Sequence, residues 1–156
     1  MVAANEPTVS GWGRLGVPGR EIRSVDLEAL TKRAVLSRGL GRSYGDSSLP
    51  PPSVHEVAST VLADRLLAFD EGTGMLRAEA GVSLRALNHT FLPRGLFVPV
   101  TPGTQFVTLG GMIASDVHGK EHHVRGTIGE HVGALRMRVA DGRIVTASAT
   151  ENADLF

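Results

Sequence analysis

The stretch RGLGRSYGD at residues 38–46 decides the fold, because it places three glycines and two arginines within nine positions. Glycines let successive backbone N–H groups converge on an anion, and guanidinium groups donate paired hydrogen bonds to phosphate oxygens. Ser43 adds a hydroxyl. The stretch therefore predicts a backbone cradle for a pyrophosphate, and its alternative is an ordinary glycine-rich connection with solvated arginines.

The residues that follow this stretch exclude a dinucleotide-binding βαβ motif. Such a motif needs a helix directly after its glycines. Here the chain continues as SSLPPP at residues 47–52, and consecutive prolines cannot lie inside a helix or a central strand. We therefore expect a long, ordered loop.

A second glycine-rich stretch runs from PGT at residues 102–104 to TLGGMIAS at residues 108–115. Thr108 is the expected N-cap of a helix built from small residues. A helix N-terminus offers unpaired N–H groups and a partial positive charge, so this stretch predicts a second phosphate cradle. The alternative is a helix that packs tightly on a sheet through Gly110 and Gly111.

A loop with three histidines follows, SDVHGKEHH at residues 115–123. Its spacing does not predict a metal site, because adjacent histidines point apart in regular structure and no helix pairs histidines at i and i+4. Beside an aromatic redox cofactor, His118 and Lys120 would position a substrate hydroxyl or stabilise negative charge. For His122 and His123 a polar surface loop is the alternative.

The composition limits the class of protein. The 156 residues are 42% hydrophobic and 21% charged, which suits one globular domain or a large piece of one. Basic and acidic residues number 16 each, so no basic excess is available to bind nucleic acid. With no cysteine, disulfides, thiolate metal sites and a cysteinyl–flavin link are excluded.

Features of a membrane span or a signal peptide are not found in the sequence. No apolar run reaches the ~18 to 20 residues of a span, and residues 1–10 lack the basic and apolar regions of a signal peptide. The expected location is cytoplasmic, with association to a membrane left open.

Helices and strands are expected in mixed order, so the predicted fold class is α+β. Helices are expected after the N-caps Asp26, Ser83 and Thr108, the second over residues 84–91. Strands are expected at residues 57–62, 66–70, 75–80, 96–99, 132–139 and 143–147. Residues 71–74 and Asp141-Gly142 are expected to be hairpin turns.

Taken in order, several segments resemble one known domain. They are GWGR at residues 11–14, RGLGRSYGD, AGVSL at 80–84, PRGLFVPVTPGT at 93–104, VTLGGMIASDVHGKEHH at 107–123 and ADGRIV at 140–145. Together they resemble the FAD-binding domain of the vanillyl-alcohol oxidase and p-cresol methylhydroxylase superfamily. Within it, the chain is most similar to the decaprenylphosphoryl-ribose oxidases and to the aldonolactone and alditol oxidases.

This resemblance implies a two-lobed α+β domain that binds FAD between its lobes. It implies that residues 1–156 are the N-terminal portion of that domain, incomplete at the C-terminus, and that the substrate domain is absent. The first pyrophosphate loop would be formed by Arg38, Gly39, Leu40, Gly41, Arg42, Ser43, Tyr44, Gly45 and Asp46. The second would be formed by Pro102, Gly103, Thr104, Thr108, Gly110, Gly111, Ser115 and Asp116, with His118 and Gly119 near the flavin ring.

The resemblance also implies an activity for the complete enzyme. It would oxidise a CH–OH group of a small sugar or sugar alcohol by hydride transfer to FAD, with a reductase as partner where the two form an epimerase. Several sugar oxidases bond their flavin to a histidine at the position of Tyr44, so FAD is expected to be held non-covalently here. The catalytic base would lie beyond Phe156, so this chain alone is expected to bind FAD weakly at most and to be inactive.

Three other classes stay open from the residues alone. One is a histidine-dependent metal hydrolase, and another is a nucleotide-phosphate binding module without redox chemistry. The third is a truncated product with no separate function.

Overall fold

The computed structural model describes residues 7–156, and its helices and strands are mixed along the chain, as the α+β prediction requires. Residues 1–6 lie outside the described residues. They make up most of residues 1–10, the segment whose sequence shows no features of a signal peptide. The strands are β1 (Thr8–Ser10), β2 (Gly16–Pro18), β3 (Arg20–Arg23), β4 (Ser37–Arg38), β5 (Glu56–Ser59), β6 (Leu66–Phe69), β7 (Leu76–Ala78), β8 (Ala134–Arg138) and β9 (Ile144–Ser148). The helices are α1 (Leu27–Thr31), α2 (Leu84–Phe91), α3 (Leu109–Ala114) and α4 (His122–Arg125).

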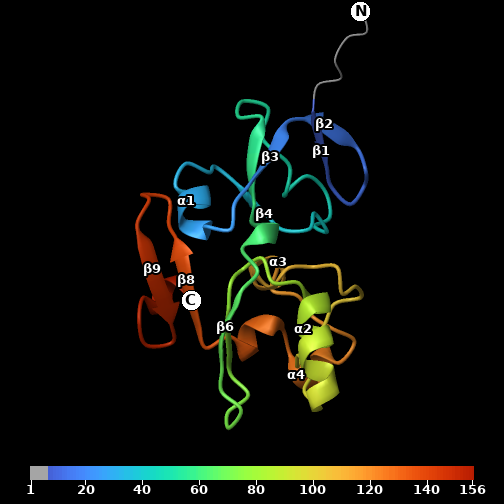
Figure 1. Cartoon of the computed structure of the whole chain (residues 1–156), viewed down its shortest axis with the longest axis vertical. Helices are drawn as coiled ribbons and strands as arrows, with labels where there is room; N and C mark the ends of the chain where they lie inside the picture. The colour runs from blue at the N-terminus through green and yellow to red at the C-terminus, as the bar shows by residue number, and fades with distance from the viewer. Residues whose placement is uncertain (1–6) are drawn as a thin grey trace, which may run out of the picture.

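The first part of the chain forms a small parallel sheet with β5 in the middle. β3 and β4 both pair with β5 in parallel, and Val57 and Ala58 of β5 are buried. β1 and β2 form a separate antiparallel hairpin beside this sheet (Figure 1). Neither this hairpin nor β3 was expected from the sequence.

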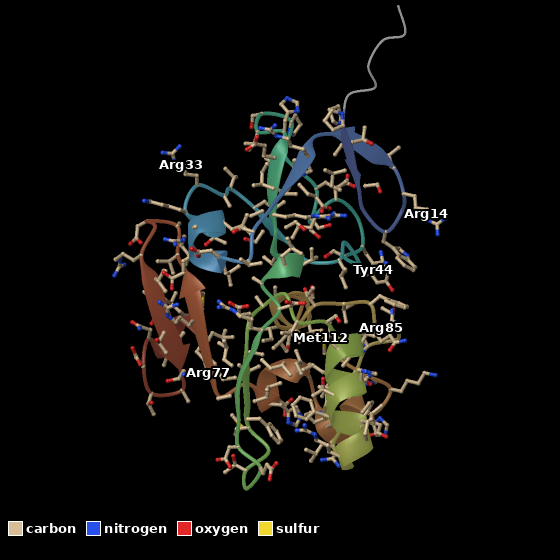
Figure 2. The ribbon with its side chains drawn as sticks, in the orientation of Figure 1. Arg14, Arg33, Tyr44, Arg77, Arg85 and Met112 are labelled. Atoms are coloured by element: carbon tan, nitrogen blue, oxygen red, sulfur yellow. The ribbon has the colours of Figure 1, made fainter. Side chains whose placement is uncertain are left out.

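The second part is built around α2 and the hairpin of β6 and β7. Leu84, Leu87 and Phe91 lie on one face of α2 and are buried, as their spacing predicts. Phe91 packs against Phe69 of β6, with ring centroids 4.8 Å apart. Met112 of α3 is fully buried in the neighbouring cluster with Leu84, and Figure 2 places it in the interior of the molecule.

The hairpin of β8 and β9 docks on α1, which comes from the first part of the chain (Figure 1). The Arg138 guanidinium donates to the Glu28 backbone oxygen at 2.9 Å and to Thr31 Oγ1 at 3.2 Å. Arg136 forms an ion pair with the Glu28 carboxylate. These contacts join residues more than 100 positions apart in the sequence.

Three expectations about secondary structure are wrong. Residues 96–99 are irregular, because no strand pairs with them. The strand predicted at residues 57–62 ends at Ser59 and turns into a 3-10 helix, Thr60–Leu62. His122 and His123, expected in a loop, open the short helix α4. No helix among residues 7–156 is long and apolar enough to cross a membrane.

Candidate functional site

The loop at residues 38–46 has backbone N–H groups that are not paired within residues 7–156 of the protein. Within the described part of the chain, no hydrogen-bond acceptor faces the backbone N–H groups of residues 39–46. Gly41 and Gly45 adopt left-handed φ angles of 65° and 64°. Glycines in the left-handed region allow backbone N–H groups to turn toward a bound anion. The loop therefore offers a series of free donors to an anion.

Arg38, predicted to contact the pyrophosphate, instead points into the protein. Its side chain is 8% exposed, and its Nε donates to Glu21 Oε1 at 2.9 Å. Nη1 donates to Ser48 O at 3.0 Å, and Nη2 to Ser10 O at 2.6 Å. These bonds hold the start of the loop against three separate segments, so Arg38 anchors the loop, and a contact of Arg38 with a phosphate stays a prediction.

The charge of Arg38 is balanced by Glu21, which also accepts from Arg23 at 2.8 Å. Burial alone would raise the pKa of the Glu21 carboxyl. The hydrogen bond from Arg23, the neighbouring Ser59 hydroxyl and the charges of Arg38 and Arg23 together outweigh burial and hold this pKa below its ordinary value. Glu21 and Ser48 were missed by the sequence reasoning, because nothing local marks residues 17 and 10 positions away as partners of Arg38.

The two glycine-rich stretches meet at Gly39 and Thr108. A Cβ atom at Gly39 would collide with the Thr108 side chain, so only glycine permits this approach. Gly41 is packed in the same way on the Arg38 guanidinium. The two stretches that the resemblance assigns to one FAD are therefore neighbours at Gly39 and Thr108.

The N-terminus of α3, predicted to be a second cradle, has no free donors in its first turn. Leu109 N–H donates to Val82 O at 2.7 Å, and Gly110 N–H to Ala80 O at 2.8 Å. Gly111 N–H is capped by Thr108 Oγ1 at 3.2 Å. This prediction needs correction, because the chain's own connection before α2 occupies the donors. The alternative of a helix packed tightly through its glycines describes α3 better.

The turn at residues 102–104 keeps open donors. The N–H groups of Gly103 and Thr104 have no acceptor among residues 7–156, whereas Thr104 Oγ1 accepts from Phe106 N–H at 3.2 Å. Gly119 packs against the Thr101 backbone, where a Cβ would lie 2.8 Å from Thr101 O. The turn and the segment with His118 are thus neighbours.

The segment at residues 115–120 is largely exposed. Asp116 has a left-handed φ of 40°, and its Oδ1 accepts from Gly129 N–H at 3.0 Å, so its carboxylate fixes a turn. His118 pairs with Thr127 in an isolated β-bridge, and the side chains of His118 and Lys120 are open to solvent. Both remain available to a ligand.

His118 forms a loose aromatic cluster with His122 and His123, which follow this segment. The rings of His118 and His122 have centroids 5.5 Å apart, and those of His122 and His123 lie 5.7 Å apart. His122 Nδ1 lies 3.1 Å from Gly119 O. Among residues 7–156, no three His, Cys, Asp or Glu side chains are arranged to hold a metal ion.

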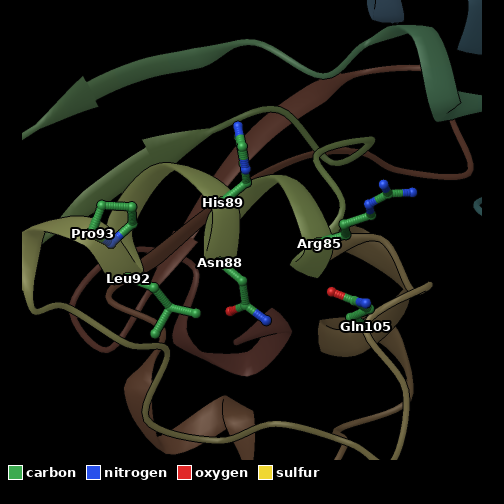
Figure 3. Close-up of a pocket in the computed structure, with 6 residues that line it drawn as sticks. All are labelled: Arg85, Asn88, His89, Leu92, Pro93 and Gln105. Atoms are coloured by element: carbon green, nitrogen blue, oxygen red, sulfur yellow. The ribbon is translucent and has the colours of Figure 1, made fainter.

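Two hollows lie elsewhere on the surface. One, of about 350 Å³, lies between α2 and the loop after it and contains none of the predicted site residues. In Figure 3, Asn88 and Leu92 leave α2 on the side of Gln105, whereas His89 leaves on the opposite side. The other, of about 520 Å³, lies along β1 and β3 and includes Arg38.

The comparisons with known proteins agree on the class of domain. Residues 22–148 match the family described as FAD binding domain. The decaprenylphosphoryl-beta-D-ribose oxidase of Mycolicibacterium smegmatis is 39% identical, over 94% of this chain and 34% of the relative. The carbohydrate oxidase of Microdochium nivale is 30% identical, over 78% of this chain and 25% of the relative.

A solved structure gives the same fold. Alkyldihydroxyacetonephosphate synthase superposes with a TM-score of 0.67 at 17% identity, over 82% of this chain and 26% of that protein. The chain spans about a third or less of the length of these relatives. The superfamily, the α+β fold class and the FAD cofactor predicted from the sequence are confirmed. This chain therefore belongs to the FAD binding domain family.

Proposed function

We propose that this chain binds FAD non-covalently, as the nucleotide-binding part of an oxidoreductase that oxidises a CH–OH group of a sugar-type substrate. The single observation that carries the proposal is the run of unpaired N–H groups at residues 39–46, joined to α3 through Gly39 and Thr108. An open run of N–H groups suits a diphosphate, which has many acceptor oxygens and no donors.

The residues expected to hold the diphosphate are fewer than the sequence predicts. The N–H groups of residues 39–46 and of Gly103 and Thr104 are free, so these bind phosphate oxygens. Ser43 adds a hydroxyl, and Arg42, which is exposed, adds a charged donor. Arg38 and α3 contact the loop from the protein interior and hold it in place. Thr108 and Gly110 thus act through packing.

Other predicted residues have roles toward the flavin and the substrate. FAD, when bound, accepts a hydride from the carbon that carries the hydroxyl. His118 and Lys120, both exposed beside the turn at residues 102–104, orient the substrate hydroxyl and stabilise negative charge. Tyr44 is 85% exposed and has no ring nitrogen for a flavin bond, which supports non-covalent binding.

The finer proposals draw on the named relatives. Two of them are named as oxidases of a ribose derivative and of carbohydrate, which supports a small sugar-type substrate. A reductase partner in an epimerase pair, association with a membrane and a substrate domain beyond these residues remain proposals of the same kind.

Equilibrium dialysis of the chain against FAD, ADP and FMN tests the proposal. We expect FAD to bind with low affinity, ADP to compete through its diphosphate, and FMN, with one phosphate, to bind more weakly still. Acid precipitation should release all flavin into the supernatant. Flavin that stays with the precipitate would contradict non-covalent binding, and no FAD retained at millimolar concentration would contradict the function.

The same experiment distinguishes a flavin-binding redox domain from a nucleotide-phosphate binding module without redox chemistry. If FAD and ADP bind with equal affinity, the flavin ring contributes nothing, and a nucleotide-phosphate module is the better description. If FAD binds more tightly than ADP, the ring makes contacts of its own.

A further inference from the structure

Trp12 lies in the turn between β1 and β2, next to the glycine-rich loop. Its neighbour Gly11 packs on the end of that loop, where a Cβ atom would lie 3.2 Å from Gly45 O. Figure 2 shows Arg14, from the same turn, and Tyr44, from the loop, on one side of the molecule. Trp12 is 55% exposed, which is unusual for a residue with so much apolar surface. The hydrophobic core therefore does not explain its position.

The Trp12 ring contacts the guanidinium of Arg42. Arg42 Cζ lies 5.7 Å from the ring centroid, within the range of a cation–π interaction. Within residues 7–156 the Arg42 guanidinium has no hydrogen bond and no carboxylate partner. Arg38, four residues earlier, uses its nitrogens internally. Arg42 is thus the arginine of the loop whose donors face outward.

The charge of the loop makes the orientation of Arg42 important. Arg38 shares the Glu21 carboxylate with Arg23, and Asp46 carries a charge opposite to that of Arg42 within the loop itself. Binding of an anion here therefore depends on donors aimed at one place as well as on charge. An exposed arginine side chain has many rotamers, and forming a contact costs the side-chain entropy of those rotamers. A ring that holds the guanidinium in advance lowers that cost.

We infer that Trp12 is a positioning residue, which holds the Arg42 guanidinium beside the open N–H groups of residues 39–46 so that it binds a phosphate group. The inference rests on the proposed function and deepens it. Trp12 is absent from the set of site residues predicted from the sequence. The phosphate belongs either to the cofactor or to a phosphorylated substrate, and the chemistry at Arg42 is the same.

The chain contains a single tryptophan, so its fluorescence reports on Trp12 alone. Pyrophosphate absorbs no light at the emission wavelength, so it changes the emission only through the surroundings of the ring. We expect pyrophosphate to change Trp12 emission in the wild-type chain and not in Arg42→Gln. Arg33→Gln, a remote exposed arginine on the other side of the molecule in Figure 2, is the control with the same charge change. An equal response of both variants would overturn the inference.

A double-mutant cycle on FAD affinity tests the coupling. Dissociation constants from equilibrium dialysis should rise about tenfold in Arg42→Gln and about threefold in Trp12→Leu, and the double variant should match Arg42→Gln. Trp12→Phe should restore most of the affinity, because it keeps an aromatic ring. Additive losses, or no loss of affinity for either FAD or pyrophosphate in Trp12→Leu, would overturn the role of Trp12. Urea unfolding of Trp12→Leu checks that the loss is not one of folding.

These experiments distinguish a failure of the proposed function from a failure of the role of Trp12. They also distinguish a phosphate of the cofactor from a phosphate of the substrate. A wild-type chain that retains no FAD contradicts the proposed function. A chain that retains FAD with equal affinity in every variant, and whose emission pyrophosphate changes equally with and without the Arg42 guanidinium, contradicts only the role of Trp12. Pyrophosphate that displaces FAD while changing Trp12 emission identifies the cofactor's diphosphate. Pyrophosphate that changes the emission without displacing FAD identifies a phosphorylated substrate.

Discussion

The loop at residues 38–46 and the first turn of α3 carry the same sequence signal, glycines beside hydroxyl residues, yet the fold uses them in opposite ways. In the loop, the N–H groups of residues 39–46 face no acceptor within residues 7–156. In α3, the first three N–H groups are all paired with the chain's own oxygens. Glycine in the loop leaves backbone open to a ligand, whereas glycine in α3 admits another segment of the same chain.

This difference teaches that a helix N-terminus is an anion site only where its own fold leaves the donors free. The partial charge of α3 is directed at Ala80 and Val82, so its glycines serve packing. The loop stays open because Arg38 holds it from within. The comparison therefore predicts that substitutions at Arg38 and in α3 lower the stability of the fold. Substitutions at the exposed residues of the loop should instead lower the affinity for the ligand.

The largest expected effect is that of Arg38→Met. Removing the guanidinium leaves Glu21 Oε1 and two backbone oxygens without their donor and Glu21 paired with Arg23 alone, which should cost about 3 kcal/mol or more of unfolding free energy. Urea denaturation followed by circular dichroism measures it. Arg38→Lys keeps a charge but not the paired geometry, and should lose less. If Arg38→Met is as stable as wild type, Arg38 does not anchor the loop.

The next effect is that of Gly110→Ala. A Cβ atom at this position would lie 2.8 Å from Ala80 Cβ and 3.1 Å from Ala80 O, so the helix must move away and weaken its hydrogen bond to Ala80. We expect a loss of about 2 kcal/mol, as for overpacked cores. Gly103→Ala is the matched control, because its Cβ would meet nothing within 4 Å. Equal stability of the two variants would mean that α3 is not closely packed.

The sequence predicts the local features of this fold well. Asp26, Ser83 and Thr108 cap helices as expected, because a cap needs only a side-chain oxygen and the N–H three residues later. The hairpins around residues 71–74 and Asp141-Gly142 were found for the same reason, since the turn residues lie between the strands they join.

Long-range pairing is where prediction from sequence fails. β3 exists because it pairs with β5, more than 30 residues later, and residues 96–99 are not a strand because no segment pairs with them. The site shows the same limit. The partners of Arg38 lie 28, 17 and 10 positions away, and the acceptors of the α3 donors lie in the connection before α2. Which donors are free therefore depends on tertiary structure.

A smaller effect on stability is expected at Thr108. Thr108→Val keeps the shape of the side chain but removes the hydroxyl that caps Gly111 N–H, at a cost of about 1 kcal/mol. Thr108→Ser should retain most of the stability. Because this hydroxyl is directed at α3 and the residue is buried, neither change should alter FAD affinity once the chain is folded. A large loss of affinity with unchanged stability would place Thr108 in contact with the ligand instead.

The smallest effect is expected from Glu79→Gln, and it should depend on pH. Glu79 accepts from the Arg65 guanidinium at 2.6 Å and from Arg65 N–H at 3.0 Å, next to Ala80, which accepts from α3. The side-chain hydrogen bond from Arg65 lowers the pKa of the Glu79 carboxyl below its ordinary value of 4.5, although burial opposes it. Arg65 is exposed, so the pair contributes at most about 1 kcal/mol.

The sign of the pH dependence follows from the direction of this shift. A carboxyl with a lowered pKa in the folded state adds stability above its unfolded pKa and loses it as the pH falls through the folded one. Wild type should therefore be more stable than Glu79→Gln at pH 7, and the difference should shrink below pH 4.5 and vanish once Glu79 is protonated in both states. Urea unfolding of both chains at a series of pH values measures the difference. A difference that stays constant down to strongly acidic pH would show that the substitution acts through packing beside α3 and not through the charge of Glu79.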